Sequence, residues 1–126
     1  MNLALSIIVA FVMIAGGGAH LAAADNFVPL VPPSLPATPI ILATGVLQIG
    51  VGLAALLPRT RSVGGIAFAA LCAAYLPLHL WDFVRPDPVF VPPLAAGMRV
   101  AVQFAFILAG YTLWKRTRET PEAAQP

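Results

Sequence analysis

Long runs of apolar residues, separated by short polar or proline-rich connections, set the pattern of the chain. Four runs reach the length of a membrane span, at residues 3–24, 40–57, 63–83 and 94–114. A hydrocarbon core of about 30 Å is crossed by about 20 helical residues. The pattern therefore predicts an all-α membrane protein, a bundle of four transmembrane helices. Residues 1–115 form its single domain, and the polar residues 116–126 predict a disordered tail.

Composition supports a membrane location and narrows the possible partners. Hydrophobic residues make up 60% of the chain and charged residues 10%, whereas soluble domains carry about 25% charged residues. The net charge of +2 is small, and the Lys and Arg residues lie near helix ends. We therefore expect contact with lipid and no binding of nucleic acid. Cys72 is the only cysteine, which excludes an intramolecular disulfide and a CxxC redox pair.

Glycine and proline mark the first apolar run and the connection after it. Gly16–Gly18 would disrupt a soluble helix, but in a membrane such small residues let helices approach closely, so they predict a packed face. The small residues after His20 would suit signal-peptide cleavage, yet the run has no Lys or Arg before it, which favours a retained helix. Residues 25–39 hold five prolines and predict a stiff, non-helical cap at the membrane surface.

The basic residues predict an orientation. The first and third connections contribute only Arg85, whereas the second connection and the stretch after the fourth run carry five basic residues: Arg59, Arg61, Lys115, Arg116 and Arg118. By the positive-inside rule, both termini lie in the cytoplasm and both proline-rich loops lie outside, in a bacterial inner membrane.

The two outer connections share a pattern that suggests an internal repeat. His20-Leu21 precedes Val31-Pro32-Pro33, and His79-Leu80 precedes Val91-Pro92-Pro93. Each copy ends one helix, crosses outside and opens the next helix. Two copies in the same orientation would make the bundle a pair of parallel-repeat helical hairpins.

Six polar side chains fall at a similar depth in the outer half of the predicted bundle, and all four helices contribute to them: His20, Gln48, Tyr75, His79, Arg99 and Gln103. An arginine in hydrocarbon costs at least a few kcal/mol on insertion scales, so Arg99 is expected to face the bundle interior. Gln103 lies one turn further on the same face. We expect an outward-opening pocket in which Arg99 shares hydrogen bonds with the two glutamines and His20. The inner half offers no comparable group.

An arginine beside glutamines is a donor array that suits a carbonyl, carboxylate or quinone oxygen. A quinone or a small anion is therefore the expected ligand. Simpler explanations stay open, because histidines at helix ends bond to headgroups and glutamines clamp helices together. Arg99 could also extend outward to the interface.

The sequence supports a metal site or a catalytic site less well than a ligand-binding pocket. His20, His79, Asp25 and Asp82 are ligand types that suit zinc or iron, but no tight motif such as HExxH is present and Arg99 would oppose a cation. A haem held by the two histidines fits less well still. No Ser-His-Asp set, phosphate loop or paired carboxylates occurs in the sequence. We therefore expect neither a metal site nor a catalytic residue.

Small residues recur on the last apolar run, on the side away from Arg99 and Gln103. They are spaced four apart, at Gly97, Ala101, Ala105 and Ala109. Such a stripe favours close helix contact and predicts packing against a neighbour, either within the chain or in a homodimer.

Several short motifs together resemble the DoxX-like family of small four-helix membrane proteins, over nearly the whole chain as far as Trp114. The matching pieces are Gly18–His20, Val31-Pro32-Pro33-x-Leu35-Pro36, Gly45…Gly50-x-Gly52 followed by Leu57-Pro58-Arg59-Thr60-Arg61, Pro77, and Arg99-x-x-x-Gln103. The chain departs from the family in two places. It has Gln48 where the family often has Glu, and Pro77-Leu78-His79 where relatives often read Pro-Ala-Asn.

The resemblance implies a membrane subunit associated with redox chemistry, either with quinone-linked oxidation of sulfur compounds or with redox maturation of periplasmic proteins. It carries no catalytic residue onto this chain, so a non-catalytic subunit is expected rather than an enzyme. The alternative is a structural or assembly subunit of a membrane complex, in which the polar residues only lock helices together. A permease is disfavoured, because no polar path reaches the inner half.

Overall fold

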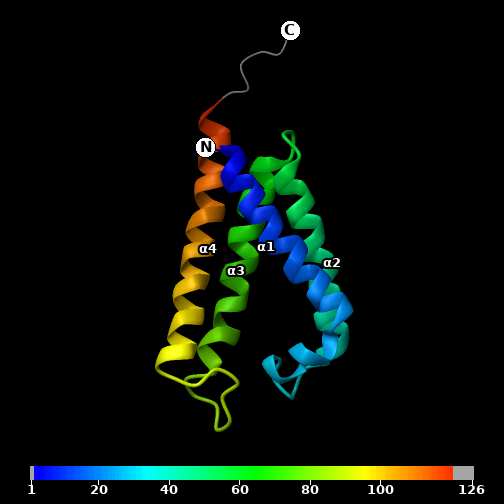
Figure 1. Ribbon diagram of the computed structural model, residues 1–126, viewed down its shortest axis with the longest axis vertical. Helices are drawn as coiled ribbons and strands as arrows, with labels where there is room; N and C mark the ends of the chain where they lie inside the picture. The colour runs from blue at the N-terminus through cyan, green and yellow to red at the C-terminus, as the bar shows by residue number, and fades with distance from the viewer. Residues whose placement is uncertain (1, 121–126) are drawn as a thin grey trace.

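The computed structural model describes residues 2–120, and these residues form helices and no strand (Figure 1). The elements in chain order are α1 (Asn2–Ala22), the 3-10 helix η1 (Ala24–Leu30), α2 (Ala37–Leu56), α3 (Arg61–Trp81) and α4 (Leu94–Glu119). All four α-helices are long and apolar enough to cross a membrane. The prediction of an all-α protein with four membrane-spanning helices is confirmed.

The fourth helix is longer than predicted. α4 continues to Glu119, so the prediction of disorder is wrong for residues 116–119, and residues 121–126 lie outside the described part of the chain. The extra turn has local support, because Lys115 lies 3.9 Å from Glu119 at the i,i+4 spacing that stabilises helices. The Thr117 hydroxyl also donates to the Leu113 carbonyl at 2.6 Å.

The proline-rich connection is more helical than predicted. The prediction of a non-helical cap over residues 25–39 is wrong for residues 25–30, where η1 accommodates Pro29, and for residues 37–39, which belong to α2. The i→i+3 bonds of such a turn are few, as from Val31 N–H to the Val28 carbonyl at 3.1 Å, so one missing donor is tolerated. α2 then begins at Ala37 rather than Ile40, because Pro39 lies in the first turn, where no backbone donor is needed.

The helices run alternately up and down and pack mainly as two hairpins, α1 with α2 and α3 with α4. Asn2 and the end of α4 lie at one end of the bundle, and the two loops at 23–36 and 82–93 lie at the other (Figure 1). We call these ends the terminal half and the loop half. α1 begins beside α4 and slants across to α2, so the two hairpins separate towards the loop half (Figure 1).

An apolar core and glycine contacts hold the bundle together. The core is built from Val9, Met13, Val51, Ala55, Phe68, Cys72 and Leu113. A Cβ added at Gly110 would lie 2.6 Å from the Gly65 carbonyl oxygen, so α3 and α4 touch backbone to backbone. Gly17 meets Gly45 in the same way, which confirms the packed face predicted there, although Gly18 meets nothing within 4 Å.

The small-residue stripe predicted on α4 packs within the chain only at Ala109, which contacts the apolar core. Ala101 and Ala105 are exposed, and the buried face instead carries Ala96, Gln103, Gly110 and Leu113. Three of these residues, Ala96, Gln103 and Gly110, are seven positions apart, which is the spacing at which a helix presents one face to a neighbour. The face thus includes the polar Gln103. The intrachain form of the prediction therefore holds at Ala109 and is wrong for Ala101 and Ala105, and a homodimer through the stripe stays a prediction.

Two glycines of α4 give a matched test of this packing. Gly110→Ala should lower the free energy of unfolding by about 1–3 kcal/mol, because the new methyl group meets backbone that cannot move aside. Gly97→Ala should be neutral or stabilising, since nothing lies within 4 Å of its added Cβ and alanine favours a helix. Thermal unfolding in mild detergent measures both. Equal stability of the two variants would contradict the close α3–α4 contact.

Candidate functional site

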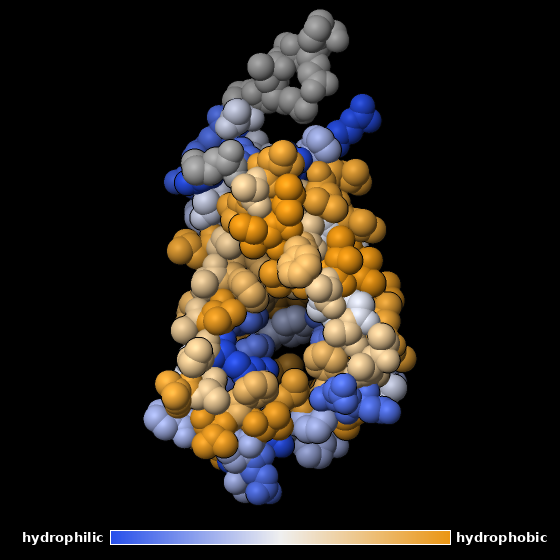
Figure 2. Space-filling view, viewed as in Figure 1, coloured by the Kyte–Doolittle hydropathy of each residue, from blue (hydrophilic) through white to orange (hydrophobic). Residues whose placement is uncertain are grey.

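A cavity of about 400 Å³ lies between the two hairpins. All six polar residues singled out in the sequence line it, and apolar residues complete the wall, among them Val12, Met13, Phe27, Leu30, Ile41, Leu78 and Phe106. Figure 2 shows the surface hollowed in the loop half, with hydrophilic residues inside and hydrophobic residues around the opening. In the same view as Figure 1, this opening falls between α4 and the pair α1–η1. The mouth therefore lies within the apolar surface of the bundle.

The α1–α2 hairpin contributes a histidine with two alternative partners. His20 Nδ1 lies 3.2 Å from Thr44 Oγ1 and 3.4 Å from Gln48 Nε2. The Thr44 hydroxyl donates to the Ile41 carbonyl at 2.9 Å, so its oxygen accepts when Nδ1 carries the proton. When Nδ1 is unprotonated, it accepts from the Gln48 amide. Phe27 of η1 packs edge-on against the His20 ring, with 4.3 Å between centroids.

Gln48 joins the two hairpins across the cavity. Its side chain is buried, and its amide donates to the Tyr75 hydroxyl of α3 at 3.0 Å. A phenol that accepts one bond keeps its own proton to donate. Tyr75 can therefore present a donor to a molecule in the cavity while Gln48 holds the ring in place.

The α3–α4 hairpin supplies two side chains that are anchored to backbone. Gln103 is buried and donates to the Cys72 carbonyl at 2.7 Å. His79 Nδ1 lies 2.8 Å from the Tyr75 carbonyl, and since a carbonyl only accepts, Nδ1 carries the proton. The neutral ring then has a free acceptor at Nε2.

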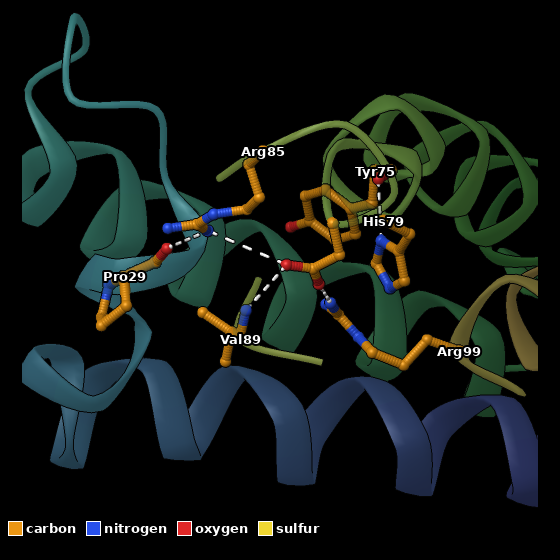
Figure 3. A network of polar contacts seen from close by, with 7 residues as sticks. Pro29, Tyr75, His79, Arg85, Val89 and Arg99 are labelled. Carbon is orange, nitrogen blue, oxygen red and sulfur yellow. Dashed lines mark hydrogen bonds and ion pairs between the residues drawn. The ribbon is translucent and has the colours of Figure 1, made fainter. Parts of the chain in front are cut away.

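Arg99 pairs with Asp82, which the sequence had suggested only as a metal ligand. The Arg99 guanidinium donates to the Asp82 carboxylate at 2.9 Å, and the Val89 N–H donates to it at 3.0 Å. Figure 3 shows Val89, Arg99 and Arg85 converging on this carboxylate. The expectation that Arg99 bonds to the glutamines and His20 is wrong, because a buried carboxylate at the end of α3 is the stronger partner.

Each arginine at the loop end also lies over an aromatic ring. The Arg99 guanidinium carbon is 4.0 Å from the centroid of Phe90, and that of Arg85 is 4.0 Å from the centroid of Trp81. Arg85 donates to the Pro29 carbonyl at 2.8 Å (Figure 3). The loop after α3 is thereby tied to η1, and the two hairpins are joined outside the cavity.

The terminal half also holds a polar cluster, contrary to the expectation from sequence. Ser6 of α1 is fully buried, and its hydroxyl donates to the Ala55 carbonyl near the end of α2. Arg61 donates to Ser6 Oγ at 3.1 Å and to the Leu56 carbonyl at 3.1 Å. These bonds satisfy the last carbonyls of α2, which have no partner within the helix. The cluster therefore closes the end of α2.

The possible metal ligands do not gather. Within residues 2–120, no group of three or more His, Cys, Asp or Glu side chains could hold a metal ion. Asp82 is held by Arg99 instead, which removes it from such a set.

The fold and the cavity define a class: a four-helix membrane-type protein with a polar chamber in one half of its bundle. The chain belongs to a family described as Domain of unknown function (DUF8561), whose model matches residues 9–114. The matched region covers all six polar residues and Asp82. No curated protein and no solved structure matches the chain.

The Arg99–Asp82 pair can be tested by a double-mutant cycle. Arg99→Leu and Asp82→Asn should each destabilise the protein, because the first takes the nearest cation from a buried carboxylate and the second takes the counter-charge from a half-buried guanidinium. Their coupling energy should be about 1–3 kcal/mol, whereas Arg99→Leu with Gln48→Leu should be additive within about 0.5 kcal/mol. Unfolding in detergent measures both cycles. Coupling of Arg99 to Gln48 but not to Asp82 would contradict the described pairing.

Proposed function

We propose that the cavity binds a small lipophilic molecule that carries carbonyl or hydroxyl oxygens, of the quinone type. The observation that carries this proposal is the convergence of polar side chains from all four helices on one chamber whose mouth lies in the apolar surface. A molecule dissolved in the bilayer could enter sideways through that mouth. The cavity volume of about 400 Å³ lies within the range of about 300–1,000 Å³ that is typical of small-molecule sites.

The available hydrogen-bonding groups favour a neutral ligand over an anion. Asp82 offsets the charge of Arg99 at 2.9 Å, so the chamber has little net positive charge to attract a carboxylate. The Tyr75 hydroxyl can donate to a carbonyl oxygen, and His79 Nε2 can accept from a hydroxyl. Aromatic and aliphatic walls from Phe27, Leu30 and Phe106 would bury the rest of a ring.

We also propose a membrane, an orientation and a kind of partner for the protein. The resemblance to the DoxX-like family supports a redox-associated membrane subunit, in which electron transfer belongs to a partner protein. The same resemblance supports a bacterial inner membrane. Both termini would lie in the cytoplasm, because the basic residues gather near the terminal half, at Arg59, Arg61, Lys115, Arg116 and Arg118. The cavity then faces the outer leaflet. Cysteines placed at Ser34 and Asp87 should react with an impermeant reagent in intact cells, and one at Thr117 should not.

A structural or assembly role is the second candidate, and one observation favours it. Within residues 2–120, no buried side-chain nitrogen or oxygen lacks a hydrogen-bond partner. Side chains that only lock helices together would give this result. Purification in mild detergent separates the candidates, because a ligand-binding protein should retain a small molecule, whereas an assembly subunit should retain a protein.

If the cavity binds a quinone, substitutions at two neighbouring residues of α2 should affect its affinity differently. Gln48→Met removes the amide that positions Tyr75, whereas Leu47→Met changes a side chain that is 52% exposed on the lipid side. For a short-chain benzoquinone measured by calorimetry, Gln48→Met should weaken binding about tenfold, which corresponds to about 1.4 kcal/mol. Leu47→Met should bind like the unaltered protein. No binding to the unaltered protein, together with a co-purified protein, would favour the assembly role.

A further inference from the structure

A second hollow adjoins the cavity along α4. Its volume is about 410 Å³, and four of its lining residues are also cavity residues: His79, Arg99, Gln103 and Phe106. The others are Phe90, Ala95, Met98 and Val102. We call this hollow the α4 groove. These shared residues place the α4 groove directly beside the chamber.

The α4 groove is apolar along its length and faces lipid. Ala95, Met98, Val102 and Phe106 are spaced three or four residues apart, so they form one stripe on the helix. At 1.5 Å per residue the stripe extends about 16 Å along the axis. Met98 is 61% exposed and Val102 is 48% exposed, so the groove is open on the bilayer side over most of its length.

Arg99 lines both hollows. Its guanidinium is held by Asp82 at 2.9 Å and lies 4.0 Å from the Phe90 ring centroid. These contacts fix the charged group by the Asp82 carboxylate at the end of α3. A polar chamber and an apolar groove therefore lie side by side along α4.

We infer that the α4 groove binds the apolar tail of the molecule whose polar head occupies the cavity. The inference rests on the proposed function and specifies its ligand as an amphiphile with one oxygen-bearing head and one extended hydrocarbon or isoprenoid tail. The position of the groove directly beside the chamber supports this occupant over an unrelated lipid chain. Because lipid chains already cover apolar surface in a bilayer, the gain comes from closer van der Waals contact of a tail that the bound head holds in place, and it grows with the length in contact.

The test compares two benzoquinones with the same head, one without a tail and one with a decyl tail. The measured quantity is the ratio of their Kd values, determined for each variant in the same detergent. Partition of the tail into micelles changes this ratio equally for all variants, so it does not affect the comparison between them. Val102→Trp fills the groove and should reduce the preference for the tailed compound about tenfold, with the affinity for the tail-less compound unchanged. Leu108→Trp is the control, because Leu108 is 65% exposed on the same helix and lines neither hollow.

The outcomes separate the inference from the proposed function. If the unaltered protein binds both compounds and Val102→Trp leaves the ratio unchanged, the tail lies elsewhere and the α4 groove is overturned. If the unaltered protein binds neither compound, the proposed function fails and the inference fails with it. Should Val102→Trp not fold, as judged by circular dichroism, Ala95→Leu provides a smaller obstruction of the same groove and should reduce the ratio in the same direction.

Discussion

Hydrocarbon offers no water to a polar side chain, so each polar group in a membrane helix must find its partner within the protein. This constraint organises the loop half of the bundle. Gln48 reaches Tyr75 across the two hairpins, Gln103 reaches a backbone carbonyl of α3, and Arg99 reaches Asp82. The first of these bonds joins the two hairpins where they diverge, and the other two tie α3 to α4 within one hairpin. The space that they border is the cavity.

The two halves of the bundle are built by different means. In the terminal half, glycines bring backbones together, as at Gly65 and Gly110, and the apolar core fills the space between the helices. In the loop half, long polar side chains keep the hairpins apart while joining them. Arg85 adds a tie outside the cavity through the Pro29 carbonyl. A closely packed terminal half next to a wider polar chamber is suited to holding a ligand.

The sequence was sufficient to predict the four membrane-spanning helices and the six polar residues that line the cavity. Apolar run length identifies membrane spans because hydrocarbon thickness fixes it, and helix geometry converts position into depth, which placed His20, Gln48 and Arg99 at one level.

The partner of Arg99 was not predictable in this way. It depends on an irregular loop that places Val89 N–H and Asp82 together, and no periodicity encodes that path. A counter-charge was nevertheless to be expected for a buried arginine, and Asp82 lies close to the start of α4 in sequence. The end of α4 was missed for a related reason, since hydropathy marks where a span ends and not where a helix ends.

The chamber in the loop half is proposed to admit a lipophilic molecule from the bilayer. Photo-crosslinking in membranes with a photoreactive quinone tests it most directly, with adducts mapped by peptide mass spectrometry. If the quinone enters the chamber, adducts should form on cavity residues such as Met13 and Phe106 and should be suppressed by excess unlabelled quinone. Adducts spread over lipid-facing residues such as Ile7 and Phe11, with no suppression by the competitor, would contradict it.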